Sequence, residues 1–309
     1  MTPRLRVLSS SMATALSLSR LRLKTALRPL TARHSSSLVT PAWLRESDRA
    51  SGHVRVIDCD HPVAFQRAHI PLATSFHAYS ATNLKDTRGG TGVMSAAEFQ
   101  QHVQQLGIDK DSTIVFYDDA MSISAARAWW VFLHYGFPKE NLKILDGGWK
   151  QWVQETKEVS TSVHAPSPAA PVTLEETGKL VGLDAVQHAL LRGSAHFVDS
   201  RTAAEYVGAQ ANGNRRVGHV PGAVNLDWKD AVAVEANGRF KTKSELEALV
   251  QQCKLTTNLD QPLITYCQRG VRAAHTAFVL HEILGYRDVK IYEDSMRQYL
   301  NRDDTAIEH

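Results

Sequence analysis

An internal repeat constrains this 309-residue chain more than any other feature of its sequence. Four blocks recur in the same order in both halves, at spacings that stay between 141 and 150 residues. The matched blocks are 56–58 with 197–199, 69–73 with 219–223, 114–118 with 263–267, and 144–149 with 291–296. A period this long indicates a duplicated domain, because the repeats of solenoid proteins are only about 20 to 50 residues long.

The duplication divides the chain into two globular domains, which we place at residues 38–155 and 177–309. Residues 156–176 between them contain three prolines and little apolar periodicity, which is typical of an extended linker. Each half alternates β-rich apolar runs with helical spacing, as at 113–117 and then 125–135. This alternation predicts an α/β fold with parallel sheets, each covered by helices on both faces.

Two Ser-x-x-Glu sequences, starting at Ser95 and Ser244, predict capping boxes at the starts of matching helices. A buried strand is expected at 262–266, with a helix beginning near Ala273. Ligands of parallel α/β sheets bind beyond the C-terminal ends of the strands. Cys267 stands at that position, so the second half carries the candidate site.

The first 36 residues differ from the rest, because they are rich in arginine and serine and the first acidic residue is Glu46. This composition is typical of an organelle transit peptide and predicts import into the mitochondrial matrix. A disordered basic tail is the alternative. In either case we exclude residues 1–36 from the fold.

Composition excludes several functional classes. The formal charge of +3 is small, so no nucleic-acid partner is expected, and no apolar run approaches the roughly 20 residues of a membrane helix. The three cysteines, Cys59, Cys253 and Cys267, form no CxxC pair. Their low and odd number argues against a disulfide framework, and their spacing argues against a structural metal site.

Cys267 opens a loop whose composition favours a reactive thiolate. Arg269 and Arg272 place two positive charges in the turn, and Gly270 allows successive backbone N–H groups to point inward. The N-terminus of the following helix adds partial positive charge. We therefore expect a lowered pKa for Cys267 and a cradle for an anionic substrate, whereas Cys253 lies in a helical stretch without such a cradle.

The matching position in the first half is Asp118, followed by Asp119. A carboxylate is not a sulfur nucleophile, and two negative charges repel an anion. The first half is therefore expected to be a catalytically silent copy that supports the active half.

At this point the sequence resembles the rhodanese family, in particular its two-domain sulfurtransferases. The resemblance covers nearly everything after residue 39. It is carried by Val-Asp-Ser-Arg at 198–201, Gly-His-Val-Pro-Gly-Ala at 218–223, Tyr-Cys at 266–267 with its loop, and Asp-Gly-Gly-Trp at 146–149.

The resemblance implies transfer of a sulfane sulfur through a persulfide on Cys267, from a small-molecule donor such as thiosulfate to cyanide or a thiol. It implies a monomer that needs no metal or organic cofactor. The implied substrate-binding residues are those of the loop together with one arginine of the Asp-x-Arg motif: Gln268, Arg269, Gly270, Val271, Arg272 and Arg201. For Arg201 two interpretations remain open, either contact with substrate or an ion pair with Glu205 or another acid.

The loop composition bears on the donor. Arg269 stands where thiosulfate enzymes of the family place a lysine, and a dianion suits two guanidinium groups. Mercaptopyruvate enzymes resemble one another in an arginine at the position of Glu205, which is expected to repel a carboxylate unless Arg215 or Arg216 compensates. Thiosulfate is therefore the predicted donor, with 3-mercaptopyruvate as the alternative.

The second half departs from the family at Met296, where relatives keep a tryptophan. We expect this change to alter the wall of the pocket.

Two other classes compete with a sulfurtransferase. Some phosphatases of similar fold use a Cys-x5-Arg loop, whereas Cys267 and Arg272 are spaced as Cys-x4-Arg, the shorter loop that suits sulfur. A non-catalytic persulfide carrier is the other alternative. His219 and His275 are interpreted as structural, because an attacking thiolate needs no general base.

Overall fold

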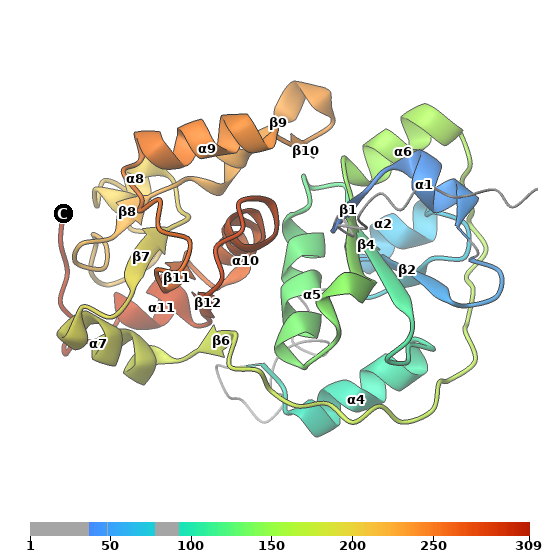
Figure 1. Cartoon of the computed structure of the whole chain (residues 1–309), viewed down its shortest axis with the longest axis horizontal. Coiled ribbons are helices and arrows are strands. Elements are labelled where there is room, and N and C mark those ends of the chain that lie inside the picture. The colour runs from blue at the N-terminus through green and yellow to red at the C-terminus, as the bar shows by residue number, and fades with distance from the viewer. Residues whose placement is uncertain (1–36, 48, 78–92) are drawn as a thin grey trace, which may run out of the picture. The chain divides into compact units, whose positions relative to one another are not determined.

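The computed structural model describes residues 37–47, 49–77 and 93–309, which form two domains of the same topology (Figure 1). Each domain holds a five-stranded sheet, ordered β1-β5-β4-β2-β3 in the first and β6-β12-β11-β7-β8 in the second. Neighbouring strands in both sheets run parallel. The predicted duplication and the predicted parallel α/β sheets are therefore confirmed. The predicted leader at 1–36 lies outside the described residues.

The strands are short, and the central ones are the longest. The first sheet contains β1 Leu38–Val39, β2 Val54–Asp58, β3 Thr74–Ser75, β4 Thr113–Tyr117 and β5 Leu142–Leu145. The second contains β6 Leu180–Val181, β7 His196–Asp199, β8 Val224–Asn225, β11 Leu263–Tyr266 and β12 Val289–Tyr292. A separate antiparallel pair consists of β9 Val232–Ala233 and β10 Arg239–Phe240.

Helices connect the strands in both domains. Those of the first domain are α1 Pro41–Glu46, α2 Pro62–Arg67, α4 Ala96–Gln105, α5 Ile123–His134, η1 Lys139–Asn141 and α6 Gly148–Thr156. Those of the second are α7 Leu183–Arg192, α8 Ala203–Tyr206, η2 Trp228–Ala231, η3 Val234–Ala236, α9 Lys243–Gln252, α10 Val271–Phe278, η4 Val279–Ile283 and α11 Ser295–Tyr299. No helix in the described part of the chain is long and apolar enough to cross a membrane.

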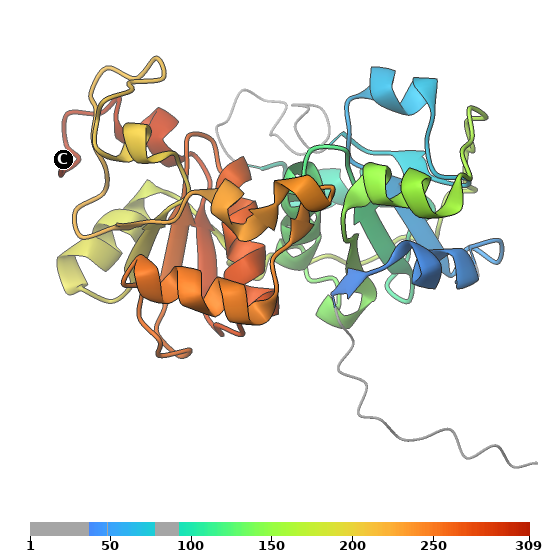
Figure 2. The ribbon, with the colours of Figure 1, turned by 90° about the horizontal axis from the view of Figure 1, so that it is seen from above.

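Helices cover both faces of each sheet (Figure 2). In β4, Val115 and Tyr117 pack with α1, α2 and α6, whereas Ile114 and Phe116 pack with α4 and α5. β11 alternates in the same way between α7 with α11 on one face and α9 with α10 on the other. Such two-sided burial explains why the strands are continuous apolar runs.

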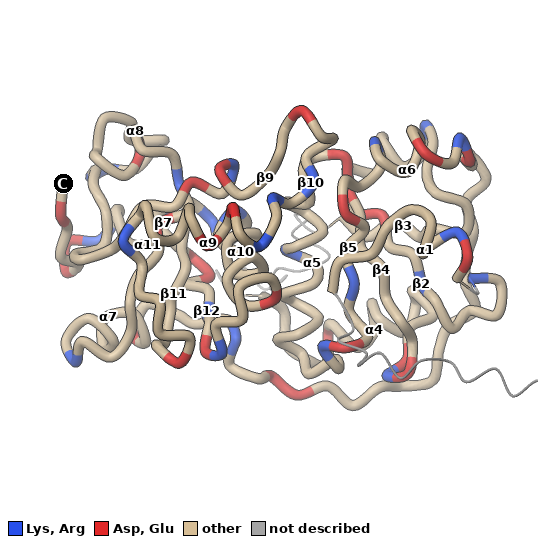
Figure 3. The backbone as a smooth tube through the Cα atoms, turned by 45° about the horizontal axis from the view of Figure 1, so that its top comes forward, with Lys and Arg blue, Asp and Glu red and all other residues tan. Residues whose placement is uncertain are grey.

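The two domains share one hydrophobic cluster, which α5 and α10 build by packing against each other. Within it the rings of Trp129 and Phe278 meet edge to face, with centroids 5.1 Å apart. Lys and Arg positions are interspersed with Asp and Glu positions over both domains (Figure 3), in keeping with the small net charge.

The helix starts show which capping predictions hold. Ser95 caps α4 in the predicted box with Glu98. The prediction at Ser244 is wrong by two residues, because Thr242 is the N-cap of α9 and Glu245 completes its box. Two overlapping Ser/Thr-x-x-Glu frames compete there, and the sequence alone does not rank them. α10 begins at Val271, two residues earlier than expected, because Gly270 takes the N-cap with a φ of +77°.

Candidate active site

Cys267 follows β11 directly, at the C-terminal edge of the second sheet, and its loop leads into α10. Its side chain is buried, with 1% of the residue surface exposed. Gly270 turns the loop into the helix through a left-handed backbone that glycine adopts without strain. The strand end, the glycine turn and the helix start therefore place Cys267 as the sequence predicted.

Ser295, which sequence reasoning missed, holds this loop in place. The backbone N–H groups of Cys267 and Gly270 both donate to Ser295 Oγ, each at 3.1 Å. The hydroxyl in turn donates to the carbonyl oxygen of Tyr292 at 2.7 Å. Two of the amides expected to bind an anion are therefore already occupied. The sequence did hold one signal for Ser295, because the block 291–296 that contains it recurs in both halves, as the block that ends at Cys267 does.

Arg272 forms a two-pronged ion pair with Glu205, with N–O distances of 2.6 and 2.9 Å. Burial disfavours the charged carboxylate of Glu205, but hydrogen bonds and the charge of Arg272 outweigh it and lower its pKa to about 2. Burial also opposes the charge on Arg272, yet Glu205 and Cys267 together raise the pKa of that guanidinium. The charge of Glu205 is therefore paired with Arg272 inside the site, and its predicted repulsion of a carboxylate stays a prediction.

Arg269 is exposed, and it has no hydrogen-bond or ion-pair partner among the described residues. Arg297 is likewise exposed, and its backbone N–H donates to the carbonyl oxygen of Gln268 at 3.0 Å. Val271, between the two arginines of the loop, is half-buried. Arg269 is thus the loop cation whose charge is not balanced by a neighbouring carboxylate in the described structure.

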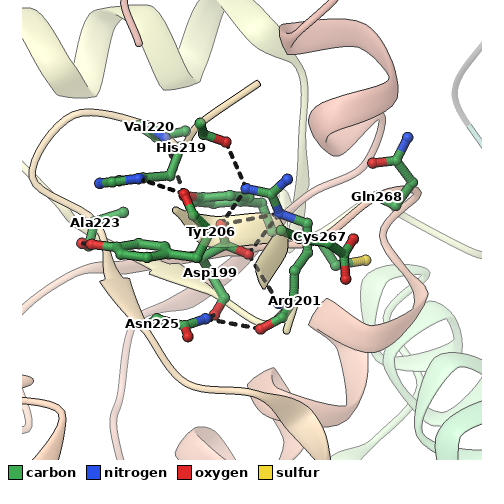
Figure 4. Close-up of polar contacts among 12 residues, drawn as sticks. Asp199, Arg201, Tyr206, His219, Val220, Ala223, Asn225, Cys267 and Gln268 are labelled. Atoms are coloured by element: carbon green, nitrogen blue, oxygen red, sulfur yellow. Dashed lines mark hydrogen bonds and ion pairs between the residues drawn. The ribbon is translucent and has the colours of Figure 1, made fainter. Parts of the chain in front are cut away.

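Arg201 does not contact the Cys267 loop. Its guanidinium binds the carboxylate of Asp199, at 2.6 Å for Nη2 to Oδ2, and also donates to the carbonyl oxygen of Gly218 at 2.8 Å. Figure 4 shows these contacts, none of which reaches the sulfur of Cys267. With 1% of its surface exposed, Arg201 is a structural residue, and its prediction as a substrate ligand is corrected. The acid that pairs with Arg201 is Asp199 rather than Glu205, because Asp199 ends β7 two residues before Arg201.

Gln268 is committed to a reciprocal amide pair with Asn214, with hydrogen bonds of 3.0 and 2.9 Å. Arg215 and Arg216 in the same segment are bound to the C-terminal tail, Arg215 through Asp303 and Arg216 through Thr305. The prediction that one of these arginines compensates for Glu205 is wrong, because both guanidinium groups already have partners.

Met296 is fully buried in the apolar cluster of α7 and α11, and its backbone N–H donates to the carbonyl oxygen of Cys267 at 3.0 Å. Its effect on the pocket wall stays a prediction. Both histidines lie in structural surroundings. His219 stacks on Tyr206 with ring centroids 3.7 Å apart, and its Nδ1 contacts the carbonyl oxygen of Tyr206 at 2.9 Å. His275 is buried beside Phe240, and burial lowers its pKa to about 3.

The corresponding loop of the first domain shows the same anion cradle already filled. The buried carboxylate of Asp118 accepts four backbone N–H groups, from Ala120, Ser122, Ser124 and Ala125, at 2.7 to 2.8 Å. Nearby Cys59 is fully buried, and burial raises its pKa well above the ordinary value. Among the described residues, no group of three or more His, Cys, Asp or Glu side chains is arranged to hold a metal ion.

Comparison with known proteins identifies the family of this chain. The model of the rhodanese-like domain matches residues 40–155 and 183–302. A thiosulfate sulfurtransferase of Corynebacterium glutamicum is 31% identical over 89% of this chain and 91% of its own length. The sulfur carrier protein TtuD of Thermus thermophilus is 30% identical over 87% and 95%, respectively.

Solved structures agree. The crystal structure of SseA from Escherichia coli, described as a 3-mercaptopyruvate sulfotransferase with the rhodanese fold, superposes with a TM-score of 0.71. It is 26% identical and covers 83% of this chain and 97% of its own. Two copies of the domain, the buried loop cysteine and these relatives together show that the chain belongs to the rhodanese family and is a tandem-domain sulfurtransferase.

Proposed function

We propose that the protein transfers the outer sulfur of thiosulfate to a thiol or cyanide through a persulfide on Cys267. The observation that carries the proposal is the placement of this cysteine. It lies at the C-terminal sheet edge, at the start of a glycine-turned loop, with the cation of Arg272 beside it. Such surroundings favour a thiolate and an anionic partner.

The proposed reaction has two displacements. The Cys267 thiolate attacks the sulfane sulfur of thiosulfate, the sulfur–sulfur bond to the central atom breaks, and sulfite leaves with the electron pair. The enzyme then carries a negatively charged Cys267 persulfide. An acceptor thiolate or cyanide attacks the terminal sulfur, which regenerates the Cys267 thiolate and releases a persulfide or thiocyanate.

Arg269 and Arg272 have different roles in this proposal. Glu205 balances the charge of Arg272, which leaves Arg272 to fix the loop and to favour the nearby thiolate. Arg269 keeps an unbalanced charge at the exposed side of the loop, where it attracts the incoming dianion. This arrangement favours thiosulfate over the monoanionic 3-mercaptopyruvate.

The first domain is proposed to be catalytically silent. The carboxylate of Asp118 occupies the four N–H groups that an anion would need. A substrate anion would have to displace it and leave a buried charge without these donors.

The deciding experiment compares thiosulfate and 3-mercaptopyruvate as donors, each with cyanide as acceptor. Higher kcat/KM for thiosulfate is expected, with loss of all turnover in Cys267→Ser. Arg269→Ala should raise KM for thiosulfate roughly tenfold, because one exposed unit charge close to a dianion in water is worth about 1.4 kcal/mol. A preference for 3-mercaptopyruvate by kcat/KM would overturn the assignment of the donor.

A sulfur carrier is a second candidate, because one relative bears that name. A carrier passes its persulfide once to a partner, so it would show a stoichiometric burst and no steady-state turnover with small acceptors. A rapid-quench time course that extends beyond one equivalent of thiocyanate separates the two functions.

We also propose a mitochondrial location, which rests on the arginine-rich and acid-free composition of residues 1–36. Fusion of these residues to a fluorescent protein should direct it to mitochondria. A diffuse signal would argue against the proposal.

A further inference from the structure

A buried ion pair links the first domain to the turn that supports the catalytic loop. Arg127 projects from α5 of the first domain, and its Nη2 lies 2.6 Å from Oε1 of Glu293 in the second. The Arg127 side chain is 2% exposed and that of Glu293 is 6% exposed. Charges so removed from water interact much more strongly than surface charges do.

Glu293 lies directly against the Cys267 loop. A Cβ atom placed on Gly270 would come within 2.7 Å of the carbonyl oxygen of Glu293 and within 3.2 Å of its Oε2. Two residues later in the same turn, Ser295 accepts the N–H groups of Cys267 and Gly270. A carboxylate therefore packs behind the loop that carries the nucleophile, and its counter-charge comes from the other domain.

The first domain shows the same exchange in reverse. Asp146, which matches Glu293 in the repeat, accepts Nε–H of Arg239 at 2.9 Å and the backbone N–H of Phe240 at 3.0 Å. Both donors belong to the second domain. Each domain thus supplies an arginine to the acidic residue that follows the other domain's matching strand, β5 or β12, and the two arginines come from different elements, α5 and β10.

We propose that Arg127 is a positioning residue for the Cys267 chemistry, because it neutralises Glu293 and so keeps negative charge away from the back of the nucleophile loop. This inference rests on the proposed persulfide function of Cys267. The first domain then contributes to catalysis through this one charge, although its own loop holds no nucleophile.

Two described neighbours of the pair, both near the end of α5, carry no charge near pH 7 that could replace Arg127. His134, also on α5, has its pKa lowered to about 4 by burial, with Arg127 lowering it further and Glu293 opposing, so it is neutral near pH 7. Burial likewise raises the pKa of the neighbouring Tyr135, so its hydroxyl stays neutral. Removal of the guanidinium therefore takes a buried positive charge away from the Glu293 carboxylate beside the loop.

The test compares Arg127→Met, Glu293→Gln and the double variant in the full chain, with the rate of iodoacetamide alkylation of Cys267 measured against pH. Arg127→Met should move the midpoint of this profile upward and lower thiosulfate kcat/KM roughly tenfold. Glu293→Gln should move the midpoint downward, because it leaves the cation. The double variant should return near the wild-type midpoint, and Arg127→Lys should largely preserve it.

These opposite directions separate an electrostatic role from a structural one. Loss of a merely structural contact would shift both single variants the same way, or neither, and that result would overturn the inference. If Arg127→Met does not fold, as judged by circular dichroism, the direction of the Glu293→Gln shift decides alone. The alkylation profile needs no donor, so it stays informative even if the protein does not use thiosulfate.

Discussion

Removal of the Ser295 hydroxyl is the sharpest test of how the catalytic loop is held. Ser295→Ala deletes an acceptor for the N–H groups of Cys267 and Gly270 and a donor to the carbonyl oxygen of Tyr292. Ser295 itself is fully buried. Water therefore has poor access to the groups that lose their partner, and the change is expected to be costly.

The magnitude follows from the three hydrogen bonds. Each contributes about 1 kcal/mol net, and a buried amide left unpaired costs up to about 3 kcal/mol. We expect Ser295→Ala to lower the free energy of unfolding by about 3 kcal/mol, equivalent to about 5 °C in Tm for a chain of this size, because unfolding gains about 2.1 cal/mol/K of entropy per residue. Thiosulfate kcat/KM should fall as well, because the loop loses its fixed shape.

Two further variants isolate the hydroxyl. Ser295 has a φ of +50°, so Ser295→Gly removes the hydroxyl but relieves the left-handed strain and should be about 1 kcal/mol more stable than Ser295→Ala. Ser200 is the matched control, since its buried Oγ has no hydrogen-bond partner among the described residues. Ser200→Ala should change the unfolding free energy by no more than about 0.5 kcal/mol. Equal Tm values for Ser295→Ala and Ser200→Ala, measured by calorimetry, would refute the account of the loop.

Three other expectations follow from the described contacts. Glu205→Gln keeps the capping geometry but breaks the pair with Arg272, and it should cost about 2 to 4 kcal/mol in denaturant unfolding. Asp118→Cys, in a chain that also carries Cys267→Ser, should form no thiocyanate from thiosulfate and cyanide. Turnover would show that the first domain is not silent. The pKa of His275, lowered to about 3, and that of His134, lowered to about 4, mean that the unfolded chain binds more protons below about pH 6.5. The contribution of these two histidines to the free energy of unfolding is therefore complete above that pH. It falls by about 1.4 kcal/mol per pH unit and per histidine as the pH decreases. His275→Phe should remove about half of that slope when the free energy of unfolding is measured against pH.

The sequence predicted the elements that depend on local pattern and on duplication. Two parallel α/β domains, the strand before Cys267 and the capping box at Ser95 all follow from periodicity, turn residues and repetition. What it did not predict are pairings between segments distant in the chain. Nothing in the composition of the loop indicates that Glu205, 67 positions away, accepts Arg272, or that Asn214 pairs with Gln268.

The assignments of Arg201, Arg215 and Arg216 failed for the same reason. A sequence supplies the number of charges near a motif, whereas function depends on which of them remain unbalanced after folding. Arg201, Arg215 and Arg216 all have partners elsewhere in the second domain. Arg269 keeps its free charge, and no local pattern separates it from the other arginines.

The two loops of the duplicated chain show how one backbone design serves two purposes. In each, backbone N–H groups of the loop that follows the central strand converge on one side-chain acceptor, Asp118 in the first domain and Ser295 in the second. Asp118 supplies a permanent anion to that cradle and accepts four of them. In the second domain, Ser295 Oγ accepts the N–H groups of Cys267 and Gly270, and the cation of Arg272 lies close to Cys267. The first domain therefore fills its loop with a carboxylate from the loop itself, whereas the loop of Cys267 is held by a hydroxyl from a separate turn.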